Sequence, residues 1–204
     1  MIHYLFLIGI TVEAMTGALA AGRKNMDMMG AIMIGVVTGL GGGAVRDLLL
    51  DRHPLSWIDN PRFVVITATA AFLTIIFSHW LRKLSRIFLI LDALGLATFS
   101  VVGTKIGIDM HLSPVIIAVV AMINGACGGM LRDILCNDVP LVLRKELYAI
   151  VALFASVLYM TINYFYPDWV GTEIFTIASA FILRLCAIYW HLELPKFHYD
   201  HSIH

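Results

Sequence analysis

The sequence has few charged residues and no net charge. Only 14% of its 204 residues are Asp, Glu, Lys or Arg, and the 14 basic residues balance the 14 acidic ones. A chain without a basic field, and without a module of basic and aromatic residues, is not expected to bind nucleic acid. Hydrophobic residues make up 60% of the chain, and the mean hydropathy is +0.86. This composition is far from that of a soluble domain and is typical of a membrane protein with several spans.

Motifs for catalysis and for metal binding are also missing. The sequence contains no Gly-x-Ser-x-Gly, no P-loop, no His-Glu-x-x-His and no haem-attachment motif. The three cysteines, Cys127, Cys136 and Cys186, lack the spacing of metal ligands, and we interpret them as small buried apolar residues. We therefore expect a protein that is not an enzyme and that has no metal site and no cofactor.

Long apolar runs are what the sequence does contain. A hydrocarbon core about 30 Å thick requires about 20 mostly apolar residues per helix. Short polar segments separate seven stretches that meet this requirement: Ile2–Ala21, Met28–Leu50, Phe63–Leu81, Ile87–Ile108, Ser113–Leu135, Leu147–Phe165 and Ile174–His191. We predict an all-α integral membrane protein with seven transmembrane helices in a lipid bilayer.

The lysines and arginines of the loops predict the orientation, because these residues concentrate on the cytoplasmic side of a membrane. One side holds eight of them, in the loops after the first, third and fifth spans and in the C-terminal tail: Arg23, Lys24, Arg82, Lys83, Arg86, Arg144, Lys145 and Lys196. The other side holds Arg52 and Arg62, with Lys105 near the end of the fourth span. We expect a cell (inner) membrane protein with its N-terminus outside and its C-terminus in the cytoplasm.

An internal repeat organises most of the chain. The segment Gly41-Gly42-Gly43-Ala44-Val45-Arg46-Asp47 returns as Cys127-Gly128-Gly129-Met130-Leu131-Arg132-Asp133. An offset of 86 relates six identical pairs: Gly39 and Gly125, Gly42 and Gly128, Gly43 and Gly129, Arg46 and Arg132, Asp47 and Asp133, and Pro54 and Pro140. Upstream, an offset of 84 pairs Thr16 with Ser100 and implies a two-residue difference in loop length.

The repeat predicts three structural units. Residues 1–86 form the first three-helix repeat, residues 87–166 the second, and residues 167–204 a seventh helix with a cytoplasmic tail. An odd number of spans inverts the second repeat relative to the first. In such architectures, substrate sites lie near the membrane midplane at broken helices.

Each glycine cluster lies inside a predicted span, although glycine costs about 1 kcal/mol relative to alanine inside a helix. A gap or kink at Gly41–Gly43 frees backbone carbonyls, which in lipid must find protein, water or an ion. Carbonyl oxygens that face a wet cavity suit a dehydrated monovalent cation. Close helix packing is the alternative, since small residues also permit it. Two inverted clusters followed by the same charged pair favour an ion pathway over close packing.

Polar side chains occupy matching repeat positions beside the glycines. These are Thr16 with Ser100, and Thr38 with Asn124. They are candidates for lining a hydrated path, and a hydrogen bond to a neighbouring carbonyl accounts for them equally well.

The adjacent arginine and aspartate of each repeat are not expected to neutralise each other, because side chains at i and i+1 of a helix do not face each other. We instead predict two pairs between helices, Asp92 with Arg132 and Lys105 with Asp47. These charges could form structural ion pairs that hold the bundle together, or they could act in gating or selectivity, and the sequence does not favour either role.

Glu13 lies in the middle of the first predicted span. A buried carboxylate there must be paired, protonated or hydrated, so Glu13 is a candidate cation ligand or proton-coupled group. The offset of 84 places Ala97 at the equivalent position, so Glu13 is not part of the duplicated machinery.

Several segments resemble the bacterial and archaeal branch of the trimeric intracellular cation (TRIC) channels, a family that also carries a glycine-transporter domain label twice per chain. The resemblance covers the first six spans through segments 16–21, 38–47, 91–95, 128–133 and 139–149. It implies a homotrimer in which each protomer has an hourglass pore lined by the second and fifth spans, kinked at their glycines and passing potassium and sodium. Cys127 replaces the third glycine of the second cluster, which implies a milder second kink.

We therefore expect a monovalent cation channel. A secondary transporter for glycine or another small zwitterion is the alternative, because discontinuous helices serve both classes. A proton-coupled transporter would favour an indispensable intramembrane carboxylate, for which Glu13 is the main candidate. A structural protein that conducts nothing is a third, more distant interpretation.

Overall fold

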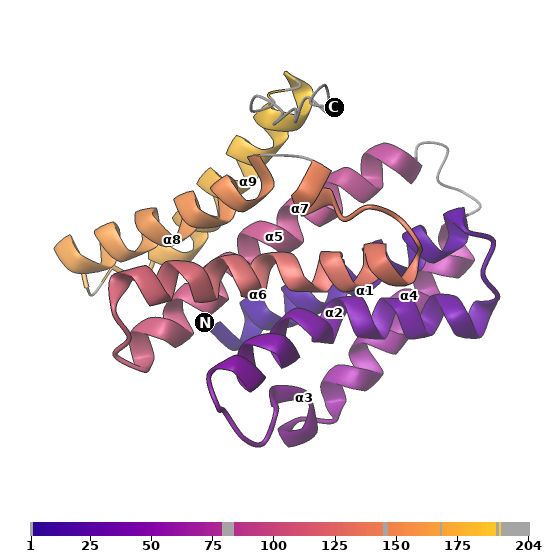
Figure 1. Ribbon diagram of the computed structural model, residues 1–204, viewed down its shortest axis with the longest axis horizontal. Coiled ribbons are helices and arrows are strands. Elements are labelled where there is room, and N and C mark those ends of the chain that lie inside the picture. The colour runs from indigo at the N-terminus through magenta and orange to yellow at the C-terminus, as the bar shows by residue number, and fades with distance from the viewer. Residues whose placement is uncertain (1, 79–83, 145–146, 168, 191, 193–204) are drawn as a thin grey trace, which may run out of the picture.

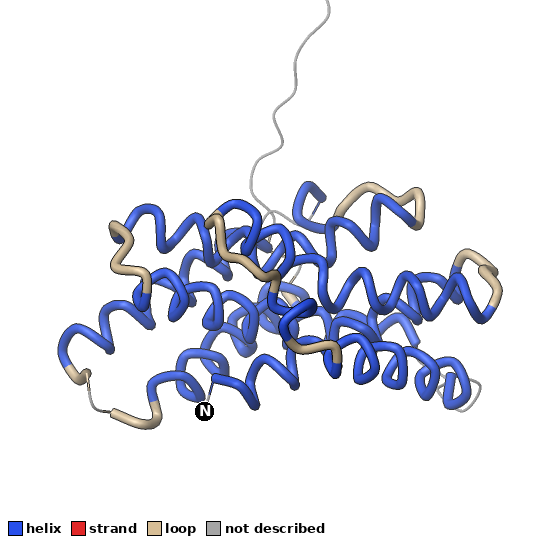
Figure 2. The backbone as a smooth tube through the Cα atoms, turned by 90° about the horizontal axis from the view of Figure 1, so that it is seen from below, coloured by secondary structure: helices blue, strands red, loops and turns tan. Residues whose placement is uncertain are grey.

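The computed structural model describes residues 2–78, 84–144, 147–167, 169–190 and 192, and all regular elements in these ranges are helices (Figures 1 and 2). In chain order they are α1 (Ile2–Arg23), α2 (Met28–Leu49), α3 (Ser56–Asp59), α4 (Arg62–Ser78), α5 (Leu84–Asp109), α6 (Pro114–Leu135), α7 (Leu141–Arg144), α8 (Leu147–Phe165) and α9 (Thr172–Tyr189). The all-α prediction is therefore confirmed for the described residues.

Within the described ranges, six helices are long and apolar enough to cross a membrane: α1, α2, α5, α6, α8 and α9. The remaining predicted span corresponds to α4, which is apolar but has 17 residues. Leu81 and His191, the predicted ends of the third and seventh spans, lie outside the described residues. The count of seven transmembrane helices therefore stays a prediction.

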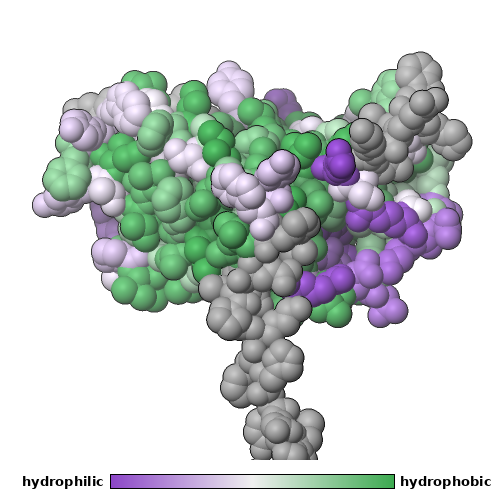
Figure 3. All heavy atoms as spheres, turned by 90° about the horizontal axis from the view of Figure 1, so that it is seen from above, coloured by the Kyte–Doolittle hydropathy of each residue, from purple (hydrophilic) through white to green (hydrophobic). Residues whose placement is uncertain are grey.

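Broad apolar surfaces cover the outside of the helix bundle. Figure 3 shows one face on which apolar residues spread over the middle and hydrophilic residues gather at one side. Large side chains from several long helices are exposed, among them Met29, Leu49, Val157, Phe165 and Ile182. Exposed apolar patches of this kind mark a surface that contacts lipid or protein.

Helix boundaries recur at a constant spacing along the chain. The helices α2 and α6 begin 86 residues apart and end 86 residues apart, as the α1 and α5 C-termini also do. Asn25, Asp51, His111 and Asn137 are the non-glycine residues with positive φ in the described part of the chain, and they form two pairs at the same spacing. Such φ values are uncommon outside glycine, so the shared turns show that the repeat extends to the backbone.

The offset of 86 also holds in the first helix of each repeat. A Cβ atom added to Gly17 of α1 would lie 2.8 Å from the carbonyl oxygen of Ile34. One added to Gly103 of α5 would lie 3.1 Å from the carbonyl oxygen of Val120. Both the glycines and the carbonyls are 86 positions apart, so α1 packs on α2 as α5 packs on α6.

The predicted upstream offset of 84 is therefore wrong, and no difference in loop length follows α1 and α5. Thr16 and Ser100 are similar in chemistry, but they do not occupy equivalent positions. Glu13 corresponds to Phe99 rather than to Ala97. The conclusion that Glu13 has no acidic counterpart still holds.

Two groups of helices form the bundle. The helices α1, α2 and α4 pack on one another, and α5, α6 and α8 do the same. The contacts between α1 and α5 and between α2 and α6 join the groups, while α9 packs on α5 and α8. In Figure 1, α2 and α6 lie along the middle of the molecule and α9 lies at its edge.

The helices α2 and α6 run antiparallel where they touch. A Cβ atom added to Gly42 would lie 2.7 Å from the carbonyl oxygen of Asn124, and one added to Gly128 would lie 2.5 Å from that of Thr38. Residues later in α2 therefore contact residues earlier in α6, as in an antiparallel pair. Gly42 and Gly128 occupy equivalent positions in the two repeats, and so do their partners, Thr38 and Asn124. The two contacts are therefore related by symmetry.

Candidate functional site

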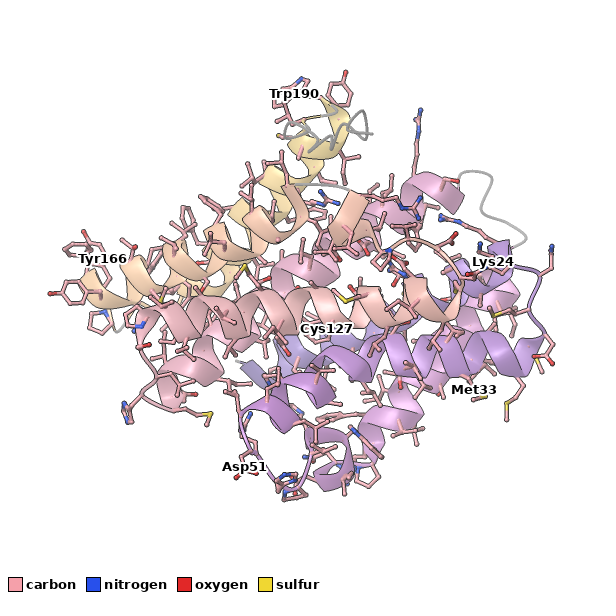
Figure 4. All side chains as sticks on the ribbon, viewed as in Figure 1. Lys24, Met33, Asp51, Cys127, Tyr166 and Trp190 are labelled. Atoms are coloured by element: carbon pink, nitrogen blue, oxygen red, sulfur yellow. The ribbon has the colours of Figure 1, made fainter. Side chains whose placement is uncertain are left out.

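The two glycine clusters lie in continuous helices. The helix α2 runs unbroken through Gly41–Gly43, and α6 runs unbroken through the second cluster. The structure therefore shows no gap that would free carbonyls there. Gly42 and Gly128 instead let the two backbones approach, which supports the close-packing interpretation at these two residues. Cys127, at the position equivalent to Gly41, is half-buried midway along α6 (Figure 4).

The other glycines of the clusters also make close contacts. A Cβ atom added to Gly39 would lie 2.7 Å from the carbonyl oxygen of Ile10 in α1, and one added to Gly125 would lie 2.5 Å from Ser100 Oγ in α5. One added to Gly41 would lie 2.6 Å from a methyl carbon of Leu131. These three glycines therefore bring neighbouring helices together.

Gly43 and Gly129 instead lie beside guanidinium groups. Added Cβ atoms would lie 3.7 Å from Arg46 Nη2 and 3.4 Å from Arg132 Nη2, respectively. These are ordinary van der Waals distances, so neither guanidinium would exclude a small side chain there. In each repeat, the arginine three residues later folds back along its own helix beside the last glycine of the cluster.

Arg46 is 2% exposed and is held by groups from α2, α3 and α6. Its Nε and Nη2 atoms donate to Asp47 Oδ1 at 2.9 and 2.7 Å, and Nη2 also donates to Ser56 Oγ at 3.1 Å. Its Nη1 atom donates to Asn124 Oδ1 at 3.1 Å. The Ser56 amide donates to Asp47 Oδ2 at 3.0 Å, which fixes the carboxylate in turn.

Arg132 is fully buried and has more acidic partners. Its Nε atom donates to Asp133 Oδ1 at 2.8 Å, and its Nη1 atom donates to Asp92 Oδ1 at 2.9 Å and to Thr16 Oγ1 at 3.0 Å. The Leu141 amide donates to Asp133 Oδ2 at 2.8 Å. The contact of Leu141 with its aspartate matches that of Ser56 in the first repeat.

The predicted pair of Asp92 with Arg132 is confirmed. The prediction that adjacent arginine and aspartate do not neutralise each other is wrong in both repeats. The i,i+1 rule describes the directions in which side chains leave the helix, but an arginine is long enough to curl back to its neighbour. A backbone amide beyond the helix end holds each aspartate within that reach.

The predicted pair of Lys105 with Asp47 is also wrong. Lys105 Nζ donates to Glu173 Oε1 in α9 at 2.8 Å, and Asp47 accepts from Arg52 as well as from Arg46. The end of α5 packs against α9, whereas the segment after α2 covers Asp47. The repeat does not predict the position of Glu173, because α9 has no counterpart in the first repeat.

The polar residues beside the glycines bond mostly to carbonyl oxygens. Thr38 Oγ1 and Ser100 Oγ donate to carbonyls one turn back in their own helices, at 2.6 and 2.7 Å. Asn124 Nδ2 reaches another helix and donates to the Phe99 carbonyl at 2.6 Å. These three residues therefore fit the interpretation that they bond to neighbouring carbonyls. Asn124 also links α5 to the Arg46 guanidinium.

Two buried residues near Arg132 escaped the sequence analysis. Tyr148 is 1% exposed, and its hydroxyl lies 3.4 Å from Asp92 Oδ1. Arg184 of α9 is 2% exposed, and its guanidinium lies 4.7 Å from the centre of the Tyr148 ring, a cation–π contact. Arg184 was visible as a charge inside a predicted span, which is the signal that would have found it.

Clefts approach the Arg46 end of the site. A cleft of about 360 Å³ is lined by Phe6, Arg46, Arg52 and Ser56, among others, and a second of about 370 Å³ is lined by Asp47 and Asp51. Within the described residues, no three His, Cys, Asp or Glu side chains gather in a way that could hold a metal ion. Charged and amide groups at the ends of the α2–α6 crossing therefore form the candidate site.

These features define a class: an α-helical membrane protein in which two similar helix groups meet at antiparallel glycine-rich helices, each with a buried arginine–aspartate pair. The sequence model of the family described as Glycine transporter matches residues 3–79 and 89–164. The chain belongs to this family. The first match covers α1 to α4, and the second begins within α5 and ends in α8.

Curated relatives match over nearly the whole chain. The UPF0126 inner membrane protein YadS of Escherichia coli K12 is 34% identical over 99% of both chains. The UPF0126 membrane protein YvgT of Bacillus subtilis is 32% identical over 94% of both chains. One of these relatives is thus named as an inner membrane protein.

Solved structures match equally well. The TRIC channel orthologue from Rhodobacter sphaeroides superposes with a TM-score of 0.89 at 34% identity, covering 94% of this chain and 98% of that one. A prokaryotic TRIC channel crystallised in 0.5 M KCl gives a TM-score of 0.88 at 29% identity, covering 95% and 98%. The predicted resemblance to the prokaryotic TRIC channels is therefore confirmed.

Proposed function

We propose that this protein is a cation channel. The observation that carries the proposal is its likeness to the Rhodobacter sphaeroides TRIC channel, at a TM-score of 0.89 and 34% identity. A further TRIC structure, from work on conductance through TRIC cation channels, matches with a TM-score of 0.83 over 98% of both chains. Similarity at this level, over almost the full length, favours a shared function.

The buried charges support passage of cations rather than anions. A bare guanidinium beside an ion path would repel a cation, but Asp47 binds Arg46 directly, and Arg132 contacts Asp92 and Asp133. Each of these two buried arginines therefore has an acidic partner at its end of the α2–α6 crossing. We place the path along these two helices, where a change in their packing opens it.

The number of spans, the oligomeric state, the permeant ions and the orientation of the proposed channel are those predicted from the sequence. We propose seven spans in two inverted repeats plus a seventh helix, a homotrimer with one pore per protomer, and permeation by potassium and sodium. The N-terminus lies outside the cell and the C-terminus in the cytoplasm. Arg23, Lys24, Arg86 and Arg144 support this orientation, while Arg82, Lys83, Lys145 and Lys196 lie outside the described residues.

A transporter for glycine or another small zwitterion is the competing function. The description of the matching family model favours it. A carrier and a channel differ in turnover by orders of magnitude, because a carrier changes conformation in every cycle. Current recordings therefore separate the two classes directly.

Purified protein in a planar bilayer under a potassium gradient should show unitary currents. We expect reversal potentials that follow the potassium or sodium gradient and do not change when glycine is added to one side. Asp138→Asn, which alters an exposed loop residue, should conduct like the wild type. Concentrative glycine uptake into proteoliposomes without unitary currents would replace the channel with the transporter.

A further inference from the structure

Glu13 is a buried carboxylate whose two oxygens have different surroundings. The residue is 1% exposed, and Oε2 accepts a hydrogen bond from Thr16 Oγ1 at 3.2 Å. Oε2 also lies 4.0 Å from Arg132 Nη1, beyond hydrogen-bond distance. Oε1 is buried and has no hydrogen-bond partner among the described residues. A carboxylate ion in a membrane interior rarely leaves an oxygen without a donor.

No cation among the described residues hydrogen-bonds Glu13. The ionisable groups on the helices around it are Asp92 from α5, Arg132 and Asp133 from α6, Tyr148 from α8, Arg184 from α9 and Arg23 at the end of α1. The Arg132 guanidinium hydrogen-bonds Asp92 and Asp133 at less than 3 Å. Arg184 lies over the Tyr148 ring and Arg23 over the Phe88 ring. An ionised Glu13 would therefore be a buried charge without a cationic hydrogen-bond donor, which favours the neutral form.

The position of Oε1 favours a proton over a metal cation. Oε1 packs against the α5 backbone at Gly95, where an added Cβ atom would overlap it and would lie 2.7 Å from the Glu13 carboxyl carbon. Gly95 thus provides a notch for the carboxyl group. A potassium or sodium ion needs several oxygen ligands around it, whereas the notch places Oε1 against carbon. A proton needs no such space.

We propose that Glu13 is a proton-binding site and that it is a neutral carboxylic acid in this packing. Loss of the proton to water leaves a carboxylate beside Asp92, and the new repulsion drives α1 and α5 apart at the Gly95 notch. Proton occupancy of Glu13 therefore stabilises the closed arrangement around Arg132. The effect of this site on current rests on the proposed channel function, but the protonation itself does not.

Infrared spectroscopy tests the protonation without any current. A protonated carboxyl group has a carbonyl stretch well separated from the bands of carboxylates, and ¹³C-glutamate labelling shifts that band for glutamates alone. The chain has four glutamates, of which Glu173 is paired with Lys105. At neutral pH we expect one labelled carboxylic-acid band, lost completely in Glu13→Gln and shifted in frequency in Gly95→Ala.

Three results would overturn the proposal. They are the lack of a labelled carboxylic-acid band in the wild type, a band that survives in Glu13→Gln, and a band whose intensity changes with potassium or sodium concentration at fixed pH. Because labelling is applied to the wild-type chain, the first result is informative even if the variants fold poorly. A labelled band together with a lack of unitary currents would retain the proton site and reject the channel.

Current recordings extend the test to function. Open probability in the wild type should rise as the pH on the Lys24 side is raised, and Glu13→Gln should remove this dependence. Asp138→Asn is the matched control, because Asp138 is an exposed acid bound to Lys24 at 2.8 Å. That hydrogen bond lowers the pKa of Asp138, so this residue stays ionised and its variant keeps the wild-type pH response. A Glu13→Gln channel with an unchanged pH response would contradict the regulatory role.

Discussion

Replacing Arg132 with methionine should lower the free energy of unfolding more than replacing Arg46 with methionine. Removal of Arg132 leaves Asp92 and Asp133 buried without their cation, and loss of one partner of a buried pair costs about 3–5 kcal/mol. Removal of Arg46 leaves only Asp47, which still accepts hydrogen bonds from the Ser56 amide and from Arg52. We expect about 1–3 kcal/mol in that case.

Denaturant titration of the protein in detergent measures the difference in free energy of unfolding between the two variants. Arg86→Met is the control, because Arg86 is exposed, and it should stay within about 0.5 kcal/mol of the wild type. Adding Asp92→Asn to Arg132→Met should recover part of the loss, since it removes one uncompensated charge. Equal losses for the two arginine variants, or strictly additive losses in the double variant, would contradict the charge assignment at Arg132.

Bulk at the centre of the α2–α6 crossing should disrupt both stability and conduction. A methyl group at position 128 would meet the Thr38 carbonyl at 2.5 Å, and one at position 42 would meet the Asn124 carbonyl at 2.7 Å. Neither backbone atom can turn away, so Gly128→Ala and Gly42→Ala must separate the helices. Overpacking costs about 1–3 kcal/mol, more than the gain of about 1 kcal/mol from alanine's helix propensity.

Gly22→Ala is the matched control for the crossing. Gly22 is also in a helix, but an added Cβ atom would meet nothing within 4 Å, so this variant should unfold like the wild type or at slightly higher denaturant. Gly128→Leu should abolish unitary currents. Normal stability and normal currents in the position-128 variants would show that the two helices are not held together at these glycines.

Hydropathy and internal identity predicted most of the fold. Each predicted span overlaps one helix, since the length of an apolar run is set by the membrane and does not depend on its neighbours. The order of the spans also led to the pair of Asp92 with Arg132, because consecutive spans cross in opposite directions and the start of α5 therefore lies near the end of α6. The family resemblance rested on the repeated segments 38–47 and 128–133 together with segments 16–21, 91–95 and 139–149, and it was confirmed.

The errors arose where side-chain reach or an unrepeated element decides the contact. Helical spacing describes where Arg46 leaves the helix, but not that its guanidinium returns to Asp47. Lys105 pairs with Glu173 of α9, a helix without a counterpart from which its position could be inferred. The offset of 84 relied on the chemical similarity of Thr16 and Ser100, and only backbone contacts reveal the correct alignment.

The contact of Gly42 with Asn124 and of Gly128 with Thr38 has the geometry of a symmetric dimer interface within one chain. In a true dimer, every substitution changes both subunits at once. Here the two halves share one chain but have separate codons, so each end of the crossing could change alone. Three acidic residues, Glu13, Asp92 and Asp133, now lie around Arg132, while one lies against Arg46. The α2–α6 crossing is therefore symmetric in its backbone contacts but not in its charges, so the two ends of the same crossing are chemically different.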